Sequence, residues 1–451
     1  MTRRCSHPSF ANTHLRFLTV LTIFLFSQAA DLSAQSAIQQ WPQFRGPLGT
    51  GAAPEADPPI EWSETKNVRW KTALPGLGHA SPIVWGNKIF LTTAVPFGEA
   101  QPAKDGHVHG AHDFIPSVQN QQFIVLAINR TDGKILWQKV VHEARPHEAG
   151  HNTASFASPS PVTDGEHIFA FFGSNGLYCL DFSGNVIWQK DLGDMHTKHA
   201  HGEGGSPALF GETIVANWDH EEQSFVVALD KRTGAERWRV LRDEVTSWAS
   251  PTIVEHNGKA QAVIAGTKRV RGYDLATGDV IWETGGMSGN IVATPIAANG
   301  NIFLGSSYEK RVFLAISLDG ARGDLTGAKN ILWTRTSNTP YVPSPLLLGD
   351  HLYYLRHYQG VISRVNIQTG EDDGGPFRLN GIRNVYASIV GAAGRIYVTD
   401  RSGATIVLSA TRQPEVLGLN RLDDRFSATM ALVGEEIFLR GEKFLFCLAE
   451  E

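Results

Sequence analysis

The 451-residue sequence has few cysteines: only Cys5, Cys179 and Cys447, and no two of them are adjacent. A disulfide framework therefore cannot hold a chain of this length together, and a packed apolar core has to do so. An excess of basic residues is also lacking, since 40 Lys and Arg stand against 45 Asp and Glu. The formal net charge of −5 excludes the cationic footprint of a nucleic-acid partner.

Long apolar runs are missing as well. Residues 17–26, "FLTVLTIFLF", form a short apolar run, well below the roughly 18–20 residues that span a bilayer. Three arginines precede this run and small residues follow it, which is the pattern of a secretory signal peptide. We predict a signal peptide over residues 1–34, cleaved after Ala34, with Ala29 or Ala37 as alternative sites. A buried helix of the mature protein is the other interpretation.

Cleavage would remove three Arg and one Asp, so the formal net charge of the mature chain becomes −7. We expect this mature protein to be periplasmic or secreted, without a transmembrane anchor and without a nucleic-acid partner. We expect it to be a monomer.

Glycine and tryptophan are abundant, with 45 and 11 copies, and they recur together. A glycine turn followed by a tryptophan appears five times, with Gly four residues before Trp in the first four copies and six before it in the fifth. The copies are "TDGKILWQK" (Trp137), "FSGNVIWQK" (Trp188), "RTGAERWRV" (Trp238), "ATGDVIWET" (Trp282) and "TGAKNILWTR" (Trp333). A wide, flat side chain at a fixed place in each repeat predicts packing between neighbouring units.

Each repeat begins with a Ser-Pro-like pair and continues as four short alternating runs separated by Gly or Asp-Gly turns. The starts are Ser81, Ser160, Ser206, Ser250, Thr294 and Ser344, followed by two degenerate copies at Ser388 and Ser427. From Ser160 onward they are 39 to 50 residues apart. Four-stranded repeats of this length are typical of propeller blades, which must stack around an axis to bury both faces.

Eight starts predict eight blades, but the last copy has only three strands before the chain ends. Residues 67–74, "NVRWKTAL", match the tryptophan-bearing strand and precede the first complete blade. The sequence therefore predicts an all-β, eight-bladed β-propeller of four-stranded antiparallel blades, closed by pairing the N-terminal strand with the last blade. We assign residues 35–66 to an N-terminal extension and residues 67–451 to the propeller.

The Gly-x3-Trp turns and the "LYCLD" and "VVALD" strands resemble the pyrroloquinoline-quinone (PQQ)-type repeat propellers. The entry segment "WPQFRGPLGTG" is similar to that of secreted PQQ-like repeat proteins of planctomycete-type bacteria. The resemblance implies two kinds of function. Quinoprotein dehydrogenases hold PQQ and calcium on the axis and carry a vicinal Cys-Cys pair, which is absent here. The outer-membrane assembly lipoprotein is a non-catalytic propeller that binds a partner through its loops.

We therefore expect a non-catalytic, extracytoplasmic binding or scaffold propeller without a cofactor. A PQQ-dependent dehydrogenase with PQQ and calcium is one alternative. A metal-dependent hydrolase or lyase acting on polysaccharide is another.

Histidines gather on one predicted face. Loops that join blades and loops between second and third strands emerge together, and ten histidines fall in these loops over the first three blades, including His107, His109 and His112. Imidazoles with a carboxylate suit zinc or a similar divalent metal. The candidate ligands are His151, His196, His199, His201, Asp219 and His220. No Cys-His metal-binding motif is present, and a hydrated histidine-rich loop face is the alternative.

Cationic residues recur on the same face in the later blades, among them Arg269, Arg311 and Arg356. They would hold an anionic ligand, which could be an acidic glycan, an anionic small molecule or the acidic loop of a protein partner. Ordinary solvated loop charge is the alternative. The residues two before the repeat starts should line the mouth of the axial channel: His79, Trp248, Tyr386 and Arg425.

Overall fold

The computed structural model describes residues 1–2, 39–103 and 113–451. Most of the predicted signal peptide, and the three histidines His107, His109 and His112, lie outside these residues. The described chain consists of short strands and two 3₁₀ segments, η1 (Gly173–Asn175) and η2 (Lys198–Ala200). Within the described part, no helix has the length and apolar character needed to cross a bilayer.

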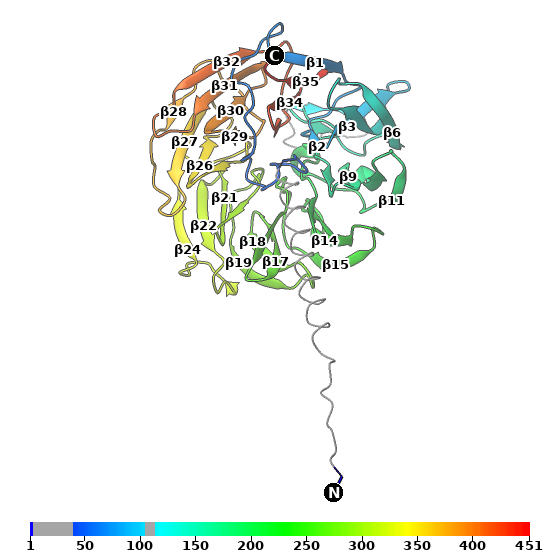
Figure 1. Cartoon of the computed structure of the whole chain (residues 1–451). Coiled ribbons are helices and arrows are strands. Elements are labelled where there is room, and N and C mark those ends of the chain that lie inside the picture. The colour runs from blue at the N-terminus through cyan, green and yellow to red at the C-terminus, as the bar shows by residue number, and fades with distance from the viewer. Residues whose placement is uncertain (3–38, 104–112) are drawn as a thin grey trace.

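Eight antiparallel four-stranded sheets surround a central axis, which confirms the predicted propeller (Figure 1). Blade 1 consists of β2 (Ile83–Trp85), β3 (Lys88–Phe97), β5 (Asn120–Asn129) and β6 (Ile135–Ala144), and blade 2 of β8 (Val162–Thr163), β9 (His167–Phe171), β10 (Leu177–Asp181) and β11 (Val186–Lys190). Blade 3 consists of β12 (Ala208–Phe210), β13 (Thr213–Trp218), β14 (Phe225–Asp230) and β15 (Glu236–Leu241). Blade 4 consists of β16 (Thr252–His256), β17 (Lys259–Ile264), β18 (Arg269–Asp274) and β19 (Val280–Gly285).

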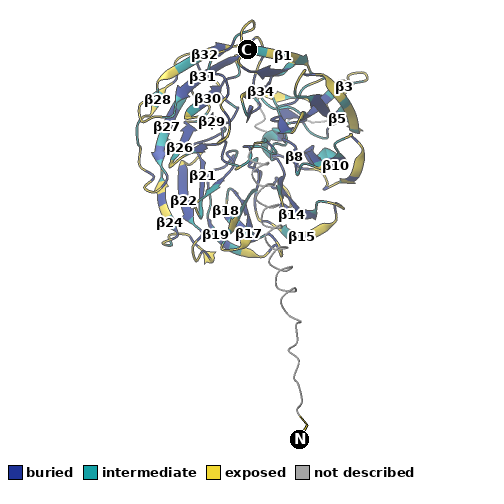
Figure 2. Ribbon diagram, in the orientation of Figure 1, coloured by how far each residue is buried: buried dark blue, intermediate teal, exposed yellow. Residues whose placement is uncertain are grey.

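Blades 5 to 8 continue the ring in the same order. Blade 5 consists of β20 (Ile296–Ala298), β21 (Asn301–Ser306), β22 (Val312–Ser317) and β24 (Ile331–Arg335), and blade 6 of β25 (Leu346–Leu348), β26 (His351–Leu355), β27 (Val361–Asn366) and β28 (Phe377–Arg378). Blade 7 consists of β29 (Val390–Ala392), β30 (Arg395–Thr399), β31 (Ala404–Ser409) and β32 (Val416–Arg421). Blade 8 consists of β33 (Ala431–Val433), β34 (Glu436–Arg440), β35 (Phe444–Leu448) and β1 (Val68–Ala73). The inner strands are buried, and exposed residues concentrate on the outer strands and turns (Figure 2).

Two short additions lie outside this pattern. The insertion of blade 1 contributes β4 (Phe114–Ile115), which pairs with β7 (Gly150–His151) of the junction between blades 1 and 2. The long turn of blade 5 contributes β23 (Gly323–Asp324), which adds a parallel fifth strand to blade 4.

The N-terminal strand closes the ring, as the sequence predicts. β1 pairs antiparallel with β35, from Val68 opposite Leu448 to Ala73 opposite Phe444. The carboxylate of Glu436 in the last blade is bonded to Arg130 of blade 1, with 2.5 Å between Nε and Oε2, and also to Arg69 of β1. These ion pairs link the first and last blades at the seam, where β1 meets β35.

The repeat starts form a closed ring of hydrogen bonds around the axis. In each blade one Ser or Thr hydroxyl accepts a hydrogen bond from the backbone N–H of the equivalent residue in the preceding blade, at 2.9 to 3.3 Å. The eight members are Ser81, Ser160, Ser206, Ser250, Thr294, Ser344, Ser388 and Thr429. We define them as the hydroxyl ring. The assignment of Ser427 as the eighth start was wrong by two residues, because two hydroxyl residues, Ser427 and Thr429, stand in this degenerate copy and neither is followed by proline.

The repeated tryptophans pack between blades, as expected. Each indole N–H donates to a backbone carbonyl of the next blade, and the ring covers the glycine of that blade's outer turn. The pairs are Trp70 on Gly133, Trp137 on Gly184, Trp188 on Gly234, Trp238 on Gly278, and Trp333 on Gly370. Trp282 differs: its indole donates to Gln261 of its own blade, and β23 pairs alongside it.

The predicted N-terminal extension is built into the propeller. Trp41 is fully buried and pairs with Val84 of blade 1, while Ala53 donates to Gly391 of blade 7, so this segment packs against the inner part of the ring and links the two blades that flank blade 8 (Figure 1, blue). The buried guanidinium of Arg45 donates to the carbonyls of Ile389 and Pro345. Phe44 lies beside it and reaches the axis.

Closure by β1 gives a first prediction. Removing the chain up to residue 73 leaves β35 with an open edge and uncovers the core of the last blade, so we expect a protein that aggregates. The control is a chain that starts at residue 39 and keeps the whole described N-terminal part. Size-exclusion chromatography and thermal unfolding compare the two. A monomeric product of unchanged stability would contradict closure by β1.

The packing of tryptophan on glycine gives a second prediction. Gly234 has φ +70°, and a Cβ there would lie 2.7 Å from the Trp188 ring. Gly234→Ala should lower the free energy of unfolding by about 2–4 kcal/mol, combining backbone strain with the clash. Gly211→Ala is the matched control, since φ is +55° and no atom lies within 4 Å. It should cost only about 1–2 kcal/mol in urea unfolding. Equal losses would show that contact with the indole is unimportant.

Candidate functional site

A cavity of about 590 Å³ lies on the axis. All eight members of the hydroxyl ring line it, and so do the eight residues that stand two positions before them in sequence: His79, Ser158, Gly204, Trp248, Val292, Val342, Tyr386 and Ser427. Of the four residues predicted to line the channel mouth, the structure places His79, Trp248 and Tyr386 in this lining. Phe44 of the N-terminal segment also lines this axial cavity.

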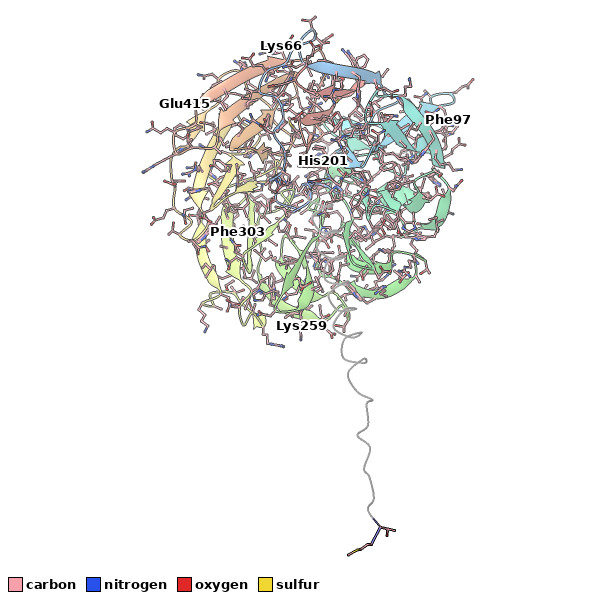
Figure 3. All side chains as sticks on the ribbon, viewed as in Figure 1. Lys66, Phe97, His201, Lys259, Phe303 and Glu415 are labelled. Atoms are coloured by element: carbon pink, nitrogen blue, oxygen red, sulfur yellow. The ribbon has the colours of Figure 1, made fainter. Side chains whose placement is uncertain are left out.

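Histidines form one wall of the axial cavity. The rings of His151 and His201 lie 4.7 Å apart edge to face, and that of His199 lies 5.4 Å from His201. The backbone N–H of His151 donates to the carbonyl of His201, which joins the loop after blade 1 to the loop after blade 2. Trp248 continues this wall, since its indole donates to the Gly202 carbonyl at 2.7 Å. His201 lies near the centre of the ring (Figure 3).

Tyrosines form the opposite wall. Tyr308 stacks on Tyr341 with ring centroids 5.8 Å apart, and Tyr358 stacks on Tyr386 at the same separation. His357 lies between the pairs, 4.5 Å from Tyr341 and 4.8 Å from Tyr358. We call Tyr308, Tyr341, Tyr358 and Tyr386 the tyrosine wall. It presents flat apolar faces with hydroxyl groups at their rims, a surface suited to a polar ligand that contains a ring.

Strained backbone concentrates around the cavity. Among residues 39–103 and 113–451, twelve residues other than glycine have φ in the left-handed region, and five of these line the axial cavity: Asp113, His199, Asn290, His357 and Asn384. Such conformations cost of order 1 kcal/mol or more each and persist where the surrounding structure imposes them. This clustering supports a functional role for the cavity rather than for another part of the surface.

Two partly buried ionisable groups of the axial cavity have pKa values shifted in favour of their neutral forms at pH 7. Burial lowers the pKa of His79 to about 3, with further lowering by the nearby cations Arg440 and Arg401. Burial raises the pKa of Glu203 to about 8, against the hydrogen bonds that its carboxyl accepts from the backbone N–H and hydroxyl of Ser174. The histidine side of the cavity is thus less charged than its composition suggests.

The six predicted metal ligands do not come together. His151, His199 and His201 line the axial cavity, whereas His196 lies with His147 and Glu148 in a separate group. Asp219 is buried and holds the guanidinium of Arg242 through bonds of 2.7 and 3.0 Å. His220 accepts from the His196 backbone N–H and contacts the Gln223 carbonyl. Asp219 and His220 are occupied by structural bonds, which sequence spacing cannot reveal.

The predicted cationic residues do not line the axial cavity either. Arg269 is paired with Asp324 at 3.1 Å, and Arg311 and Arg356 are exposed near His357, outside the lining of the axial cavity. Desolvation lowers the pKa of His357, and the charges of Arg356 and Arg311 lower it further.

Arg425 lies in a neighbouring cavity instead of the axial one, because the register of the last repeat is shifted by two residues. This cavity brings four arginines together, Arg383, Arg401, Arg421 and Arg425. We call it the arginine cavity. It shares Asn384 and Arg401 with the axial cavity, so the two are continuous.

Sequence reasoning missed most of the tyrosine wall. Tyr308 and Tyr358 occupy the loops between second and third strands, two and three residues beyond β21 and β26, and Tyr341 stands three residues before its ring member. An aromatic residue at these repeat positions was a usable signal. Glu203 was also missed, since nothing in its local sequence shows that it is enclosed.

The structure is a closed eight-bladed propeller, and its axial cavity is lined by loops that join blades and by loops between second and third strands. Residues 121–373, more than half of the chain, match the family described as outer membrane protein assembly factor BamB. The chain belongs to this family. A search of curated proteins gives no match.

Solved structures share the fold at low identity. The crystal structure of BamB from Moraxella catarrhalis gives a TM-score of 0.52 at 14% identity, covering 79% of this chain and 98% of that one. The quinohemoprotein alcohol dehydrogenase from Comamonas testosteroni gives 0.60 at 9% identity, with 92% and 84% covered. A europium-containing methanol dehydrogenase gives 0.59 at 11% identity, with 90% of each chain covered. At these identities the likeness establishes the fold alone.

The raised pKa of Glu203 gives a third prediction. Between the ordinary pKa of 4.5 and about 8, the folded chain keeps a proton that the unfolded chain releases. The contribution of Glu203 to stability is therefore complete at low pH and is lost as pH rises through this window. Glu203→Gln should remove a decline of roughly 2–4 kcal/mol in the free energy of unfolding between pH 5 and 8.5.

The charged neighbours Glu148 and Asp194 also raise the pKa of Glu203, and both remain in the variant. Urea unfolding at a series of pH values is the measurement. Glu166→Gln, on an exposed turn, is the matched control and should keep the wild-type slope. Parallel curves for wild type and Glu203→Gln would contradict the assignment.

Proposed function

We propose that this protein is a non-catalytic binding propeller that acts outside the cytoplasm and holds an acidic glycan on its loop face. The observation that carries the proposal is the continuity of the tyrosine wall with the arginine cavity. The Arg401 guanidinium lies 5.6 Å from the Tyr386 ring centroid and belongs to both cavities. A sugar ring stacked on the tyrosines could therefore place an acidic substituent among the arginines.

The arginine cavity is well supplied with unused donors. Within the described part of the chain, the guanidinium groups of Arg383, Arg421 and Arg425 have no ion-pair or hydrogen-bond partner. The carboxylate in this cavity, Asp400, is bonded to the backbone N–H of Arg383 at 2.9 Å and to that of Ser402 at 2.8 Å. The carboxylate of Asp400 therefore neutralises only part of the positive charge of the four arginines in this cavity. Guanidinium groups bind carboxylate or sulfate through paired hydrogen bonds, which suits uronic acids and sulfated sugars.

A quinoprotein dehydrogenase is the second candidate, favoured by the similarity of fold to quinoprotein alcohol dehydrogenases. The donor set argues against it. Calcium needs carboxylate oxygens that are free to coordinate it, and both oxygens of Glu203 in the axial cavity already accept hydrogen bonds from Ser174. The vicinal cysteine pair is absent from the sequence, and Cys179 and Cys447 lie buried in different blades. These residues do not fit PQQ with calcium.

A protein partner remains compatible with the same face. The matched family is described as an outer membrane assembly factor, which favours a scaffold role for the loops and a periplasmic or secreted location. The separation of the predicted metal ligands weakens the third interpretation, a metal-dependent hydrolase or lyase acting on polysaccharide.

A fourth prediction tests the glycan. Calorimetric titration with a uronic-acid tetrasaccharide should show saturable binding that weakens with added salt, and a neutral glucose tetrasaccharide should bind much more weakly. The double variant Arg383→Ala/Arg425→Ala and the variant Tyr358→Ala should each weaken binding of the acidic sugar about tenfold or more, because they remove charge-assisted bonds and the stacking surface.

The matched control is Arg322→Ala. It removes an exposed arginine from a different cavity, formed by blades 4 and 5, which is part of neither the axial cavity nor the arginine cavity. It should bind the acidic sugar as wild type does. Equal affinity for acidic and neutral sugars, or equal loss in the control, would overturn the proposed ligand. Dye reduction dependent on PQQ, calcium and an alcohol would favour the dehydrogenase instead.

A further inference from the structure

We propose that His147, Glu148 and His196 form a site for a divalent transition metal, with zinc as the best-suited ion. One ligand atom from each of the three residues lies within 4.8 Å of the others. Two histidines and a carboxylate are a ligand set that zinc uses, leaving a fourth position for water. This inference is independent of the proposed glycan.

The distance between two of the ligand atoms suits a single ion, whereas the 4.8 Å limit for all three exceeds what one zinc spans, so binding needs a small adjustment. Nδ1 of His196 lies 3.8 Å from Oε2 of Glu148. Bonds of 2.0–2.2 Å allow two ligand atoms of one zinc to be at most about 4.4 Å apart. The His196 side chain is about half exposed, at 51%, so it has room to adjust.

The other two ligands are already oriented. Nε2 of His147 donates to the Met195 carbonyl at 2.8 Å, because a carbonyl can only accept, and this leaves Nδ1 of the neutral ring as the atom able to bind a cation. Oε1 of Glu148 accepts from the Thr197 backbone N–H at 3.0 Å and from the Thr197 hydroxyl. Oε2 makes only a longer contact of 3.3 Å with that N–H and remains free to bind a metal.

Local charge also favours a cation. Oδ1 of Asp194 lies 3.9 Å from Nδ1 of His147, and Oε1 of Glu222 lies 3.8 Å from Nε2 of His196. Together with Glu148, three carboxylates surround two imidazoles. Lys198, two residues beyond His196 in the chain, directs its ammonium group to Glu309 of blade 5 at 3.5 Å.

The position of the site gives it a structural consequence. His147 and Glu148 belong to the loop after blade 1, which also carries His151, and His196 belongs to the loop after blade 2, which also carries His199 and His201. An ion bound here would fasten together the two loops that build the histidine wall of the axial cavity. The inferred metal is thus outside that cavity and orders its wall.

Zinc titration of the chelator-treated full-length protein at pH 7.5 tests this inference, with a chromophoric chelator as competitor and cobalt absorption as a second readout. Wild type should bind one equivalent more tightly than about 1 μM. His147→Ala and His196→Ala should each weaken binding at least about tenfold and remove the cobalt spectrum of a nitrogen-bound site.

Two controls make the outcome decisive. His199→Ala removes a histidine of the axial cavity, and His256→Ala removes a distant histidine of blade 4. Both variants should leave zinc binding unchanged. Thermal unfolding without metal shows whether each variant is folded. The proposal is overturned if wild type binds no zinc tighter than about 1 μM, or if His199→Ala abolishes binding while His196→Ala does not. Glycan titration is a separate measurement, so either proposal can fail alone.

Discussion

The fold depends on the hydroxyl ring. Each of its eight side chains accepts the backbone N–H of the preceding blade, and Thr429 returns the series to Ser81. The buried N–H groups at the start of every inner strand would otherwise lack partners, which is costly inside a protein. Because each bond joins neighbours, the ring fixes the spacing of the blades. The tryptophans add a second set of links at the outer edge, so five of the eight junctions are held at both radii.

This double fixation explains where ligand chemistry is found. The first strand of each blade is fixed by its ring member, so the residues just before that member must lie at the axis, whatever side chain they carry. The sequence can vary there without disturbing the blades. Histidine and tryptophan at some junctions, and tyrosine at others, therefore give one cavity two unlike walls. The left-handed backbone at His199 and His357 belongs to this variable layer.

Repeat periodicity made the architecture predictable. Gly before Trp marked the outer strands, Ser-Pro marked the inner ones, and the unmatched "NVRWKTAL" revealed the closing strand. Periodicity failed at the eighth start, where Ser427 and Thr429 are both available and neither is followed by proline, and the wrong choice moved Arg425 by two residues. The site was harder to predict from the sequence, because its ligand sets depend on bonds between loops that are distant in the chain. Nothing near Asp219 in sequence discloses Arg242, and nothing near Glu148 discloses the Thr197 hydroxyl.

Closure of the ring by β1 also bears on how the chain folds. Blades 1 to 7 each contain four strands that are continuous in sequence and can pair as soon as they are available. Blade 8 cannot be completed until the residues near Leu448 meet those near Val68, almost a full chain length away. Joining such distant segments carries the largest loop-closure entropy in the molecule and is slow in β-rich proteins. The last step of folding should therefore be the meeting of the two chain ends, with the other blades already formed.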